Sequence, residues 1–208
     1  MLKENDFIEI DYVAKIKGNG IFDLTKEDVA KENNVYDSET RYKPVIICIG
    51  KGDVIRGLDN FLVGKEIGKK YIVEISPEEG FGKKDHGLIK LVPTKEFTKQ
   101  NVKPMPGMHM NMGGIMGKVI SVAGGRTLVD FNNPLSGRDL IYEVEVNRKV
   151  EDKKEQLLGF LDIVLRDPKL ELKGDEAIIT AKVEPELKDR LEKEIKERIE
   201  ISKITFKE

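Results

Sequence analysis

Alternating apolar and polar residues predict β-strands through much of the chain. The clearest example is Phe7–Ile16, where apolar side chains recur at nearly every second position. Gly18-Asn19-Gly20 follows as a hairpin-type turn, so the strand after it is expected to pair back. The remaining strands predicted for the same unit are Ile21–Leu24, Pro44–Ile49, Lys70–Ile75 and Leu140–Val146.

Helical patterning is short in this part of the chain. The stretch Thr25–Tyr42 has no strong period and predicts a surface excursion with one helical turn near Asp28–Asn33. Gly50–Ile67 predicts a loop, a short helix and a second loop, with Leu58 and Leu62 on one helical face. A sheet with little helix to cover it is therefore expected.

The pattern changes at about Asp85 and again after Val150. Three short strands separated by Gly-Gly pairs predict a small β unit, at Met108–Met112, Ile115–Val122 and Thr127–Phe131, preceded by an apolar run at Leu88–Val92. The last part predicts an α+β unit. It has a helix around Leu157–Leu165, strands at Leu170–Leu172, Ala177–Val183 and Ile204–Phe206, and a helix that begins at Pro185 and carries the stripe Leu187, Leu191, Ile195 and Ile199.

Composition narrows the class of protein. The 36 Lys and Arg nearly balance the 38 Asp and Glu, and the net charge of −2 gives no general attraction to nucleic acid or to an anionic membrane. No apolar run approaches the ~18 residues that a membrane span needs. Cys48 is the single cysteine and lies in an apolar run, so we expect a buried thiol and a cytoplasmic protein.

Residues for covalent or metal-assisted chemistry are scarce. His86 and His109 are the only histidines, and neither has cysteine or acidic neighbours at metal-ligand spacing. We therefore expect no metal and no cofactor. Any catalysis has to proceed without a nucleophile.

One segment carries a specific signal. Gly50-Lys51-Gly52-Asp53-Val54-Ile55-Arg56-Gly57-Leu58 resembles the central signature of FKBP-type peptidyl-prolyl isomerases. Phe22-Asp23 before it, Phe81-Gly82 after it and the strand Leu140–Val146 occupy the positions of further family markers. Four motifs in the expected order cover roughly residues 7–150.

The resemblance also implies a domain organisation. The unit after Phe81-Gly82 lies where SlyD-like members carry an inserted flap domain with chaperone activity, and the C-terminal extension is similar to that of long archaeal members, in which it is associated with dimerisation. The expected fold is α+β: an FKBP-like antiparallel sheet wrapped on a short helix, an inserted small β-rich domain and a C-terminal α+β domain. The expected boundaries are 1–84 and 133–151 for the FKBP domain, 85–132 for the insert and 152–208 for the last domain.

The family pattern implies the site residues. Phe22, Asp23, Ile55 and Tyr142 are expected to be catalytic, with the backbone N–H of Ile55 offered to a substrate carbonyl and Asp23 as the one acidic group. The expected substrate-binding walls are Tyr12, Val45, Val54, Leu58 and Phe81. Leu58 stands where the family often has Trp, and Phe81 where it often has Tyr, so weaker binding of macrolide inhibitors is expected.

The insert has its own signal. Five of the six methionines lie between Met105 and Met116. Met108, Met110 and Met112 alternate and would share one face of a strand, where flexible side chains adapt to many apolar partners. They bind unfolded chain if exposed and fill a small core if buried.

These features predict a cytoplasmic peptidyl-prolyl cis-trans isomerase and folding chaperone. Its partners would be unfolded or proline-containing polypeptides, with no nucleic acid or membrane, and a homodimer would form through the C-terminal domain. One alternative is a non-catalytic holdase chaperone with a vestigial pocket. Another is an assembly module in which the Leu187/Leu191/Ile195/Ile199 stripe contacts a second subunit.

Overall fold

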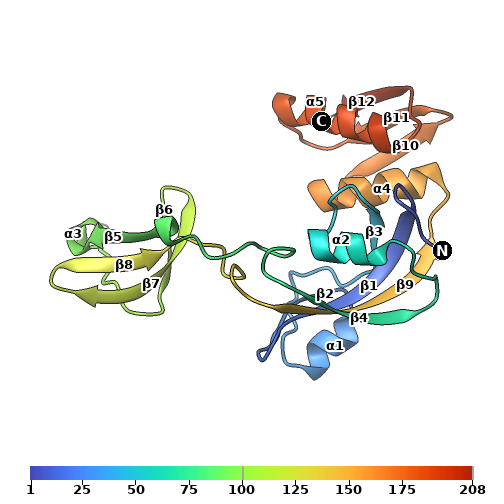
Figure 1. The fold of residues 1–208 in the computed structure, drawn as a ribbon. Helices are drawn as coiled ribbons and strands as arrows, with labels where there is room; N and C mark the ends of the chain where they lie inside the picture. The colour runs from blue at the N-terminus through green and yellow to red at the C-terminus, as the bar shows by residue number, and fades with distance from the viewer. Residues whose placement is uncertain (100, 208) are drawn as a thin grey trace.

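The computed structural model describes residues 1–99 and 101–207 and contains three separate β-sheets (Figure 1). The first sheet has the strand order β2-β1-β9-β4, and β3 pairs with the other half of β1. All of its pairings are antiparallel. Its strands are β1 (Phe7–Ile16), β2 (Ile21–Leu24), β3 (Val45–Cys48), β4 (Lys70–Ile75) and β9 (Leu140–Lys149).

Two helices accompany this sheet. Helix α2 (Arg56–Leu62) buries Leu58 and Leu62 in a core with Ile8, Ile10 and other residues of the sheet. Helix α1 (Glu27–Glu32) lies in the excursion between β2 and β3 and buries only Ala30. The expected sheet wrapped on a short helix is therefore present, and the α+β class is confirmed.

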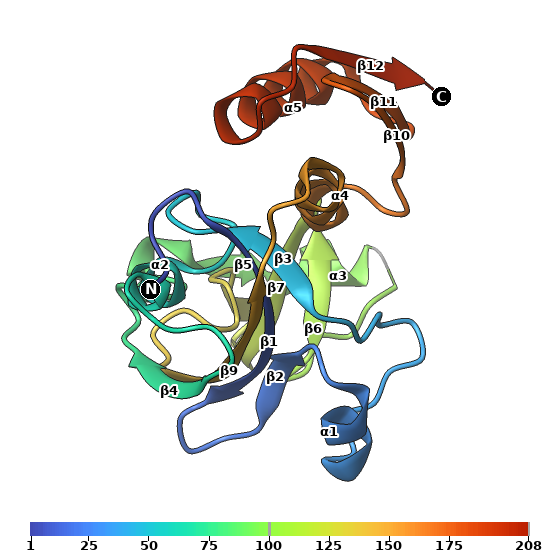
Figure 2. The ribbon, with the colours of Figure 1, turned by 90° about the vertical axis from the view of Figure 1, so that its right-hand side faces the viewer.

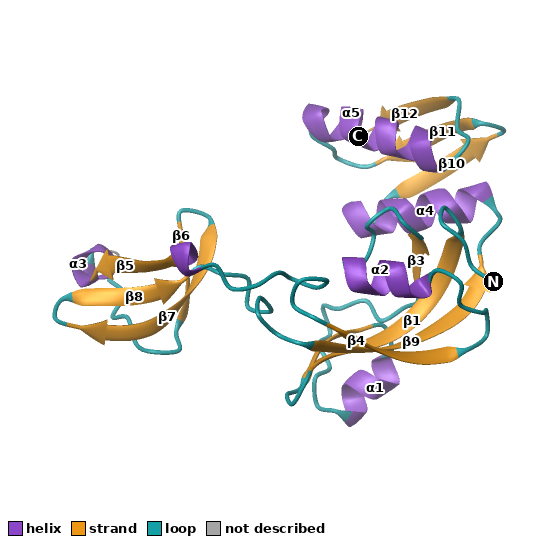
Figure 3. Ribbon diagram, viewed as in Figure 1, coloured by secondary structure: helices purple, strands orange, loops and turns teal. Residues whose placement is uncertain are grey.

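The second sheet has the order β5-β8-β7-β6 and stands apart from the first, joined to it by two loop segments (Figure 3). Its strands are β5 (Ile89–Pro93), β6 (His109–Met112), β7 (Ile115–Ala123) and β8 (Arg126–Asp130). A 3-10 turn at His86–Leu88 and helix α3 (Thr94–Thr98) complete it. Neither of these was predicted, because three and five residues are too few to show a helical period.

The third sheet follows helix α4 (Lys153–Val164) and comprises β10 (Lys169–Lys173), β11 (Glu176–Thr180) and β12 (Lys203–Lys207). Strands β10 and β11 are antiparallel, whereas β11 and β12 are parallel and are connected through helix α5 (Pro185–Arg198). Strand β11 ends at Thr180, three residues before the predicted end. Although Val183 lies beyond the strand, it is buried in the core of this unit.

The apolar stripe of α5 belongs to the core of this chain. Leu191, Ile195 and Ile199 are at most 3% exposed, and Leu187 packs against the same cluster. The same cluster also holds Phe7 and Cys48 of the first sheet, because α4 packs across β3 (Figure 2). Three of the four stripe residues are therefore covered within the chain, and Leu187 is half-buried.

Gly159 allows α4 to approach β3. A Cβ atom at this position would lie 2.5 Å from Cβ of Ile46 and 2.7 Å from its Cγ2, closer than side chains tolerate. Within the described residues, none of the helices has the length and hydropathy to cross a bilayer.

Candidate active site

The loop before α2 owes its shape to two glycines and a buried carboxylate. Gly50 and Gly52 have φ angles of +80° and +73°, a region that side chains disfavour. Their backbone N–H groups donate hydrogen bonds to the carboxylate of Asp59 at 2.8 and 3.1 Å. The loop thus turns back on the helix, and Ile55 becomes the residue that precedes the first turn of α2.

Ile55 is arranged as a donor at the end of this loop. Its carbonyl accepts hydrogen bonds from the N–H groups of Leu58 and Asp59, both at 3.0 Å. Its own N–H has no acceptor among residues 1–99 and 101–207. An unpaired backbone donor at the rim of a hollow is suited to bind a carbonyl oxygen.

A pocket of about 370 Å³ opens beside this loop. Three aromatic rings meet in it edge to face: the Phe22 ring centroid lies 6.2 Å from that of Phe81 and 6.1 Å from that of Tyr142. Edge-to-face packing at this distance is a favourable arrangement and gives the wall a fixed shape. The residues that line the pocket are Tyr12, Phe22, Asp23, Gly52, Asp53, Val54, Ile55, Phe81 and Tyr142.

Two acidic residues line the pocket, Asp23 and Asp53, so the expectation of a single acidic group was wrong. The Tyr12 hydroxyl donates a hydrogen bond to Oδ2 of Asp23 at 2.8 Å. Burial and the Asp23 charge raise the pKa of both Tyr12 and Tyr142 above the ordinary tyrosine value. Both phenols therefore stay neutral at physiological pH, and Tyr12 remains a donor that orients Asp23.

The predicted wall residues do not all reach the pocket. Tyr12, Phe22, Asp23, Val54, Ile55, Phe81 and Tyr142 line it. Leu58 is fully buried beneath it, in the core that α2 forms with the sheet. Val45 lies instead in a neighbouring groove that shares Tyr12 and Asp23 with the pocket.

Two lining residues, Gly52 and Asp53, were not predicted as site residues, although they belong to the glycine-rich motif. Asp53 accepts a hydrogen bond from the Cys48 N–H at 2.8 Å and forms an ion pair with Arg198 of α5. The two side chains are only 5% and 8% exposed. A residue of the C-terminal unit therefore contacts the loop that forms the pocket.

The alternating methionines of the insert face its interior. Met110 is 9% exposed and belongs to a cluster with Phe97, Val119 and Val129. Met108 and Met112 are half-buried against the same cluster. The structure therefore favours a core-filling role for these methionines. Other apolar side chains of the insert are the exposed ones.

Metal-binding geometry is absent from the described residues: no three His, Cys, Asp or Glu side chains gather closely enough there to hold an ion. Cys48 is fully buried, and burial together with the Asp53 charge raises the pKa of its thiol to about 11. It is the buried thiol expected from the sequence, not a nucleophile.

Comparison with known proteins decides the family. The chain is 34% identical over 146 residues to the short-type peptidyl-prolyl cis-trans isomerase of Methanocaldococcus jannaschii, a match that covers 70% of this chain and 92% of that relative. This chain belongs to the FKBP-type peptidyl-prolyl cis-trans isomerase family. The resemblance drawn from the sequence motifs is confirmed, and with it the assignment to a family of enzymes.

Other FKBP-type relatives point to the SlyD branch. SlyD of Vibrio cholerae is 31% identical over 137 residues, covering 64% of this chain and 67% of the relative. SlyD of Escherichia coli K12 is 25% identical over 147 residues, covering 69% and 74%. The family model described as "FKBP26, IF domain" matches residues 90–135, which contain all of the second sheet except the first residue of β5.

Proposed function

We propose that this protein catalyses cis/trans isomerisation of X–Pro peptide bonds in the pocket beside α2. The observation that carries the proposal is the aromatic hollow of about 370 Å³, with the N–H of Ile55 at its rim and without an acceptor in the part of the chain that the structure describes. Phe22, Phe81 and Tyr142 give an apolar wall for a proline ring. The names of the relatives support the same activity.

The chemistry needs no nucleophile. Amide resonance opposes rotation about the X–Pro bond with a barrier of roughly 18–20 kcal/mol. Resonance is lost in the twisted transition state, so the carbonyl becomes less polar and an apolar pocket favours that state over the planar amide. Each ~1.4 kcal/mol of preferential stabilisation speeds the exchange about tenfold.

Individual groups have distinct roles in this proposal. The Ile55 N–H holds a substrate carbonyl and fixes the chain while the bond rotates. Asp23, oriented by Tyr12, lies beside the reacting amide, and the aromatic rings exclude water from it. Positioning and electrostatic stabilisation together supply the rate enhancement.

The test is the exchange rate of a short X–Pro peptide, measured by NMR without a coupled protease. We expect Phe22→Ala and Asp23→Ala each to lower kcat/KM about tenfold or more, because each removes a contact made in the transition state and a loss of ~1.4 kcal/mol of stabilisation slows the exchange tenfold. Phe61→Ala and Asp28→Ala are matched controls. Phe61 packs on the same core outside the pocket, and Asp28 is exposed on α1.

Unchanged exchange in the Phe22 and Asp23 variants would refute the pocket as the catalytic site. Absence of exchange in the unmodified protein would favour the alternative, a holdase chaperone with a vestigial pocket. Melting temperatures of all variants show whether folding is retained.

We further propose that the second sheet and its helix α3 form an inserted flap domain that binds unfolded chain. The unit exposes several large apolar side chains, with Leu91 54%, Met105 61%, Ile115 59% and Met116 57% exposed. A separate hollow of about 490 Å³ is lined by Val102, Pro104, Val122 and neighbouring polar residues. Exposed apolar surface of this kind is a binding surface for apolar partners.

Replacing Leu91 and Met116 together by Ser tests this part. We expect suppression of aggregation of a reduced client protein to fall, while exchange of a short X–Pro peptide stays unchanged. Lys90→Ser is the matched control on the same strand. Equal suppression by the double variant and the control would place chain binding elsewhere.

A homodimer through the C-terminal domain and a cytoplasmic location remain predictions. Sedimentation of the full chain tests the first. Because the α5 stripe is internal, a dimer would have to use another surface of that domain.

A further inference from the structure

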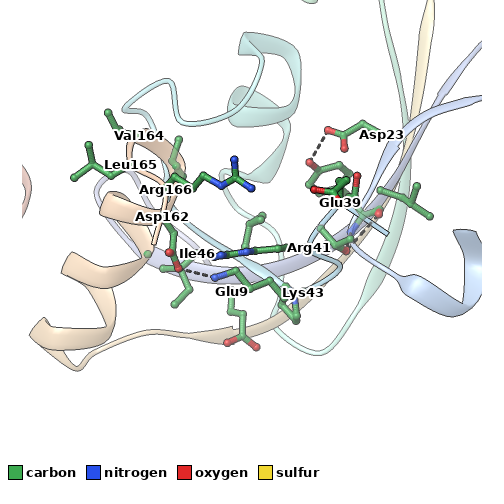
Figure 4. A pocket seen from close by; sticks show the side chains of 18 residues that line it. Glu9, Asp23, Glu39, Arg41, Lys43, Ile46, Asp162, Val164, Leu165 and Arg166 are labelled. Carbon is green, nitrogen blue, oxygen red and sulfur yellow. Dashed lines mark hydrogen bonds and ion pairs between the residues drawn. The ribbon is translucent and has the colours of Figure 1, made fainter. Parts of the chain in front are cut away.

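A groove larger than the pocket adjoins it (Figure 4). Its volume is about 880 Å³, against about 370 Å³ for the pocket, and Tyr12 and Asp23 line both. One wall is the end of α4 with the residues after it. The other is the segment between α1 and β3, together with β3 itself.

Apolar side chains line both walls. Ile163 and Val164, at the end of α4, are 43% and 40% exposed although they are large and apolar. Val45 and Ile46 of β3 line the opposite wall. Apolar side chains on two opposite walls of an open groove are typical of a site that binds an extended polypeptide.

Two ion pairs cross between the walls. Nζ of Lys43 lies 2.7 Å from Oδ2 of Asp162, and Arg41 pairs with Asp167. Each pair joins the segment before β3 to the end of α4 or the turn that follows it. Exposed pairs contribute little stability singly, and these two bridge the walls.

Arg166 is the cation of the groove that has no ion-pair partner in the described ranges, residues 1–99 and 101–207. Figure 4 shows its guanidinium reaching from the α4 side into the groove, toward the side that carries Asp23. A free guanidinium in this place can donate hydrogen bonds to backbone carbonyls of a bound chain.

We infer that this groove binds the polypeptide segment that adjoins the X–Pro bond, as an extended stretch with apolar side chains. The inference rests on the proposed isomerase function, since the pocket must hold the proline for the adjoining residues to enter the groove. Continuity argues for this occupant: a chain bound at Asp23 and Tyr12 meets the groove without crossing other surface. The C-terminal domain would thereby contribute directly to substrate selection.

Three peptides and one double variant test the inference. The first peptide is an X–Pro tetrapeptide, which fills only the pocket. The second and third carry six additional apolar-rich residues before or after the proline. The variant is Ile163→Ser with Val164→Ser, and Ile72→Ser, on β4 and 71% exposed, is the matched apolar control outside the groove.

For the unmodified protein we expect one of the two extended peptides to show a higher kcat/KM than the tetrapeptide. The double variant should lose about tenfold of kcat/KM on that extended peptide, because two apolar contacts are removed. Its activity on the tetrapeptide should stay within twofold of the unmodified protein. Fluorescence anisotropy of the same extended peptide should show a matching loss of affinity, with Arg166→Ala weakening it as well.

Equal kcat/KM for all three peptides, or equal loss in the double variant and the Ile72→Ser control, would refute binding of the adjoining segment in the groove. Either result would leave the proposed isomerase function of the pocket unaffected. An extended-peptide advantage that survives in the double variant would also overturn it, since the additional residues would then bind outside the groove. Lack of exchange of the tetrapeptide by the unmodified protein would instead refute the proposed function itself.

Discussion

At the residue scale, the Asp53–Arg198 ion pair links two distant parts of the chain at the pocket. Arg198 also donates to the Lys51 carbonyl at 3.4 Å and stacks over the Phe160 ring at 4.6 Å. Lys51 and Asp53 precede Val54 and Ile55, which line the pocket. Arg198, the last residue of α5, thus contacts the pocket loop from 145 positions along the chain.

Replacing Arg198 by Met should destabilise the protein by about 3–5 kcal/mol, because it leaves the Asp53 carboxylate buried without its partner. Urea unfolding measures the effect. Arg190→Met is the control on the same helix. Arg190 is 75% exposed and, among the residues that the structure describes, pairs only with Glu194, so a change within about 0.5 kcal/mol is expected there. Similar losses in both variants would show that Arg198 has no special role.

At the element scale, the two segments that connect the second sheet to the first are joined by hydrogen bonds. We call this junction, residues 84–85 and 130–132, the neck. Asn132 accepts a hydrogen bond from the Asp85 N–H at 2.8 Å and returns one to the Asp85 carbonyl at 2.9 Å. Lys84 pairs with Asp130 at 2.8 Å. These contacts hold the two connecting segments side by side where the chain leaves the first unit.

Asp130 makes this neck sensitive to acid. Burial by itself would raise the pKa of Asp130, but hydrogen bonds from Lys84 and Asn132 outweigh burial and lower it to about 2, from 3.8. The folded state binds the proton more weakly than the unfolded state, so the Asp130 contribution to stability is complete above about pH 4. It is lost as the pH falls from about 4 to about 2.

NMR titration of the Asp130 carboxylate should give a midpoint near pH 2, with the Asn132 amide signal moving in parallel. In Asp130→Asn, the Asn132 amide should lose this titration. A midpoint near the ordinary aspartate value would contradict the neck geometry.

Packing of α4 on β3 depends on Gly159. Alanine in a helix is ordinarily more favourable than glycine by ~1 kcal/mol. At Gly159, however, the added Cβ would meet Ile46, so we expect Gly159→Ala to destabilise the protein by about 1–3 kcal/mol. Thermal or urea unfolding measures this. Gly20→Ala, where a Cβ meets nothing within 4 Å, is the control, and stabilisation by Gly159→Ala would disprove the close approach.

At the scale of the whole molecule, the two additions to the first sheet are attached in different ways. The insert has its own core around Phe97 and Val129 and meets the rest through the neck. The C-terminal unit shares one core with Phe7, Cys48 and Val150 of the first unit. Removal of the two parts should therefore have different consequences.

Replacing residues 86–131 by a short Gly-Ser loop should change the melting temperature of the remaining protein by only a few degrees. Truncation after Glu151 should lower it by about 10 °C or more, since exposing shared core costs several kcal/mol and 1 kcal/mol corresponds to roughly 2–4 °C at this size. Differential scanning calorimetry distinguishes the two. Equal effects would mean that the shared core contributes little.

The sequence by itself determined the strands, the order of the motifs and the family. Alternation in Phe7–Ile16 reports which side chains are buried, and the glycines at 50 and 52 are needed for a loop with positive φ angles. These properties are local, and each can be recognised from a few consecutive residues. The strand predictions followed from them, whereas the predicted pocket wall followed from the resemblance to the FKBP-type family.

Only the tertiary structure decided what each buried face packs against. From the sequence, the alternating methionines and the α5 stripe could each serve either a partner or the core of their own unit, and both pack within the chain. Val45 proved to line a groove formed with α4, and Asp53 proved to pair with Arg198. A local pattern records that a side chain avoids water but not which distant surface covers it, because that depends on how the elements meet in space.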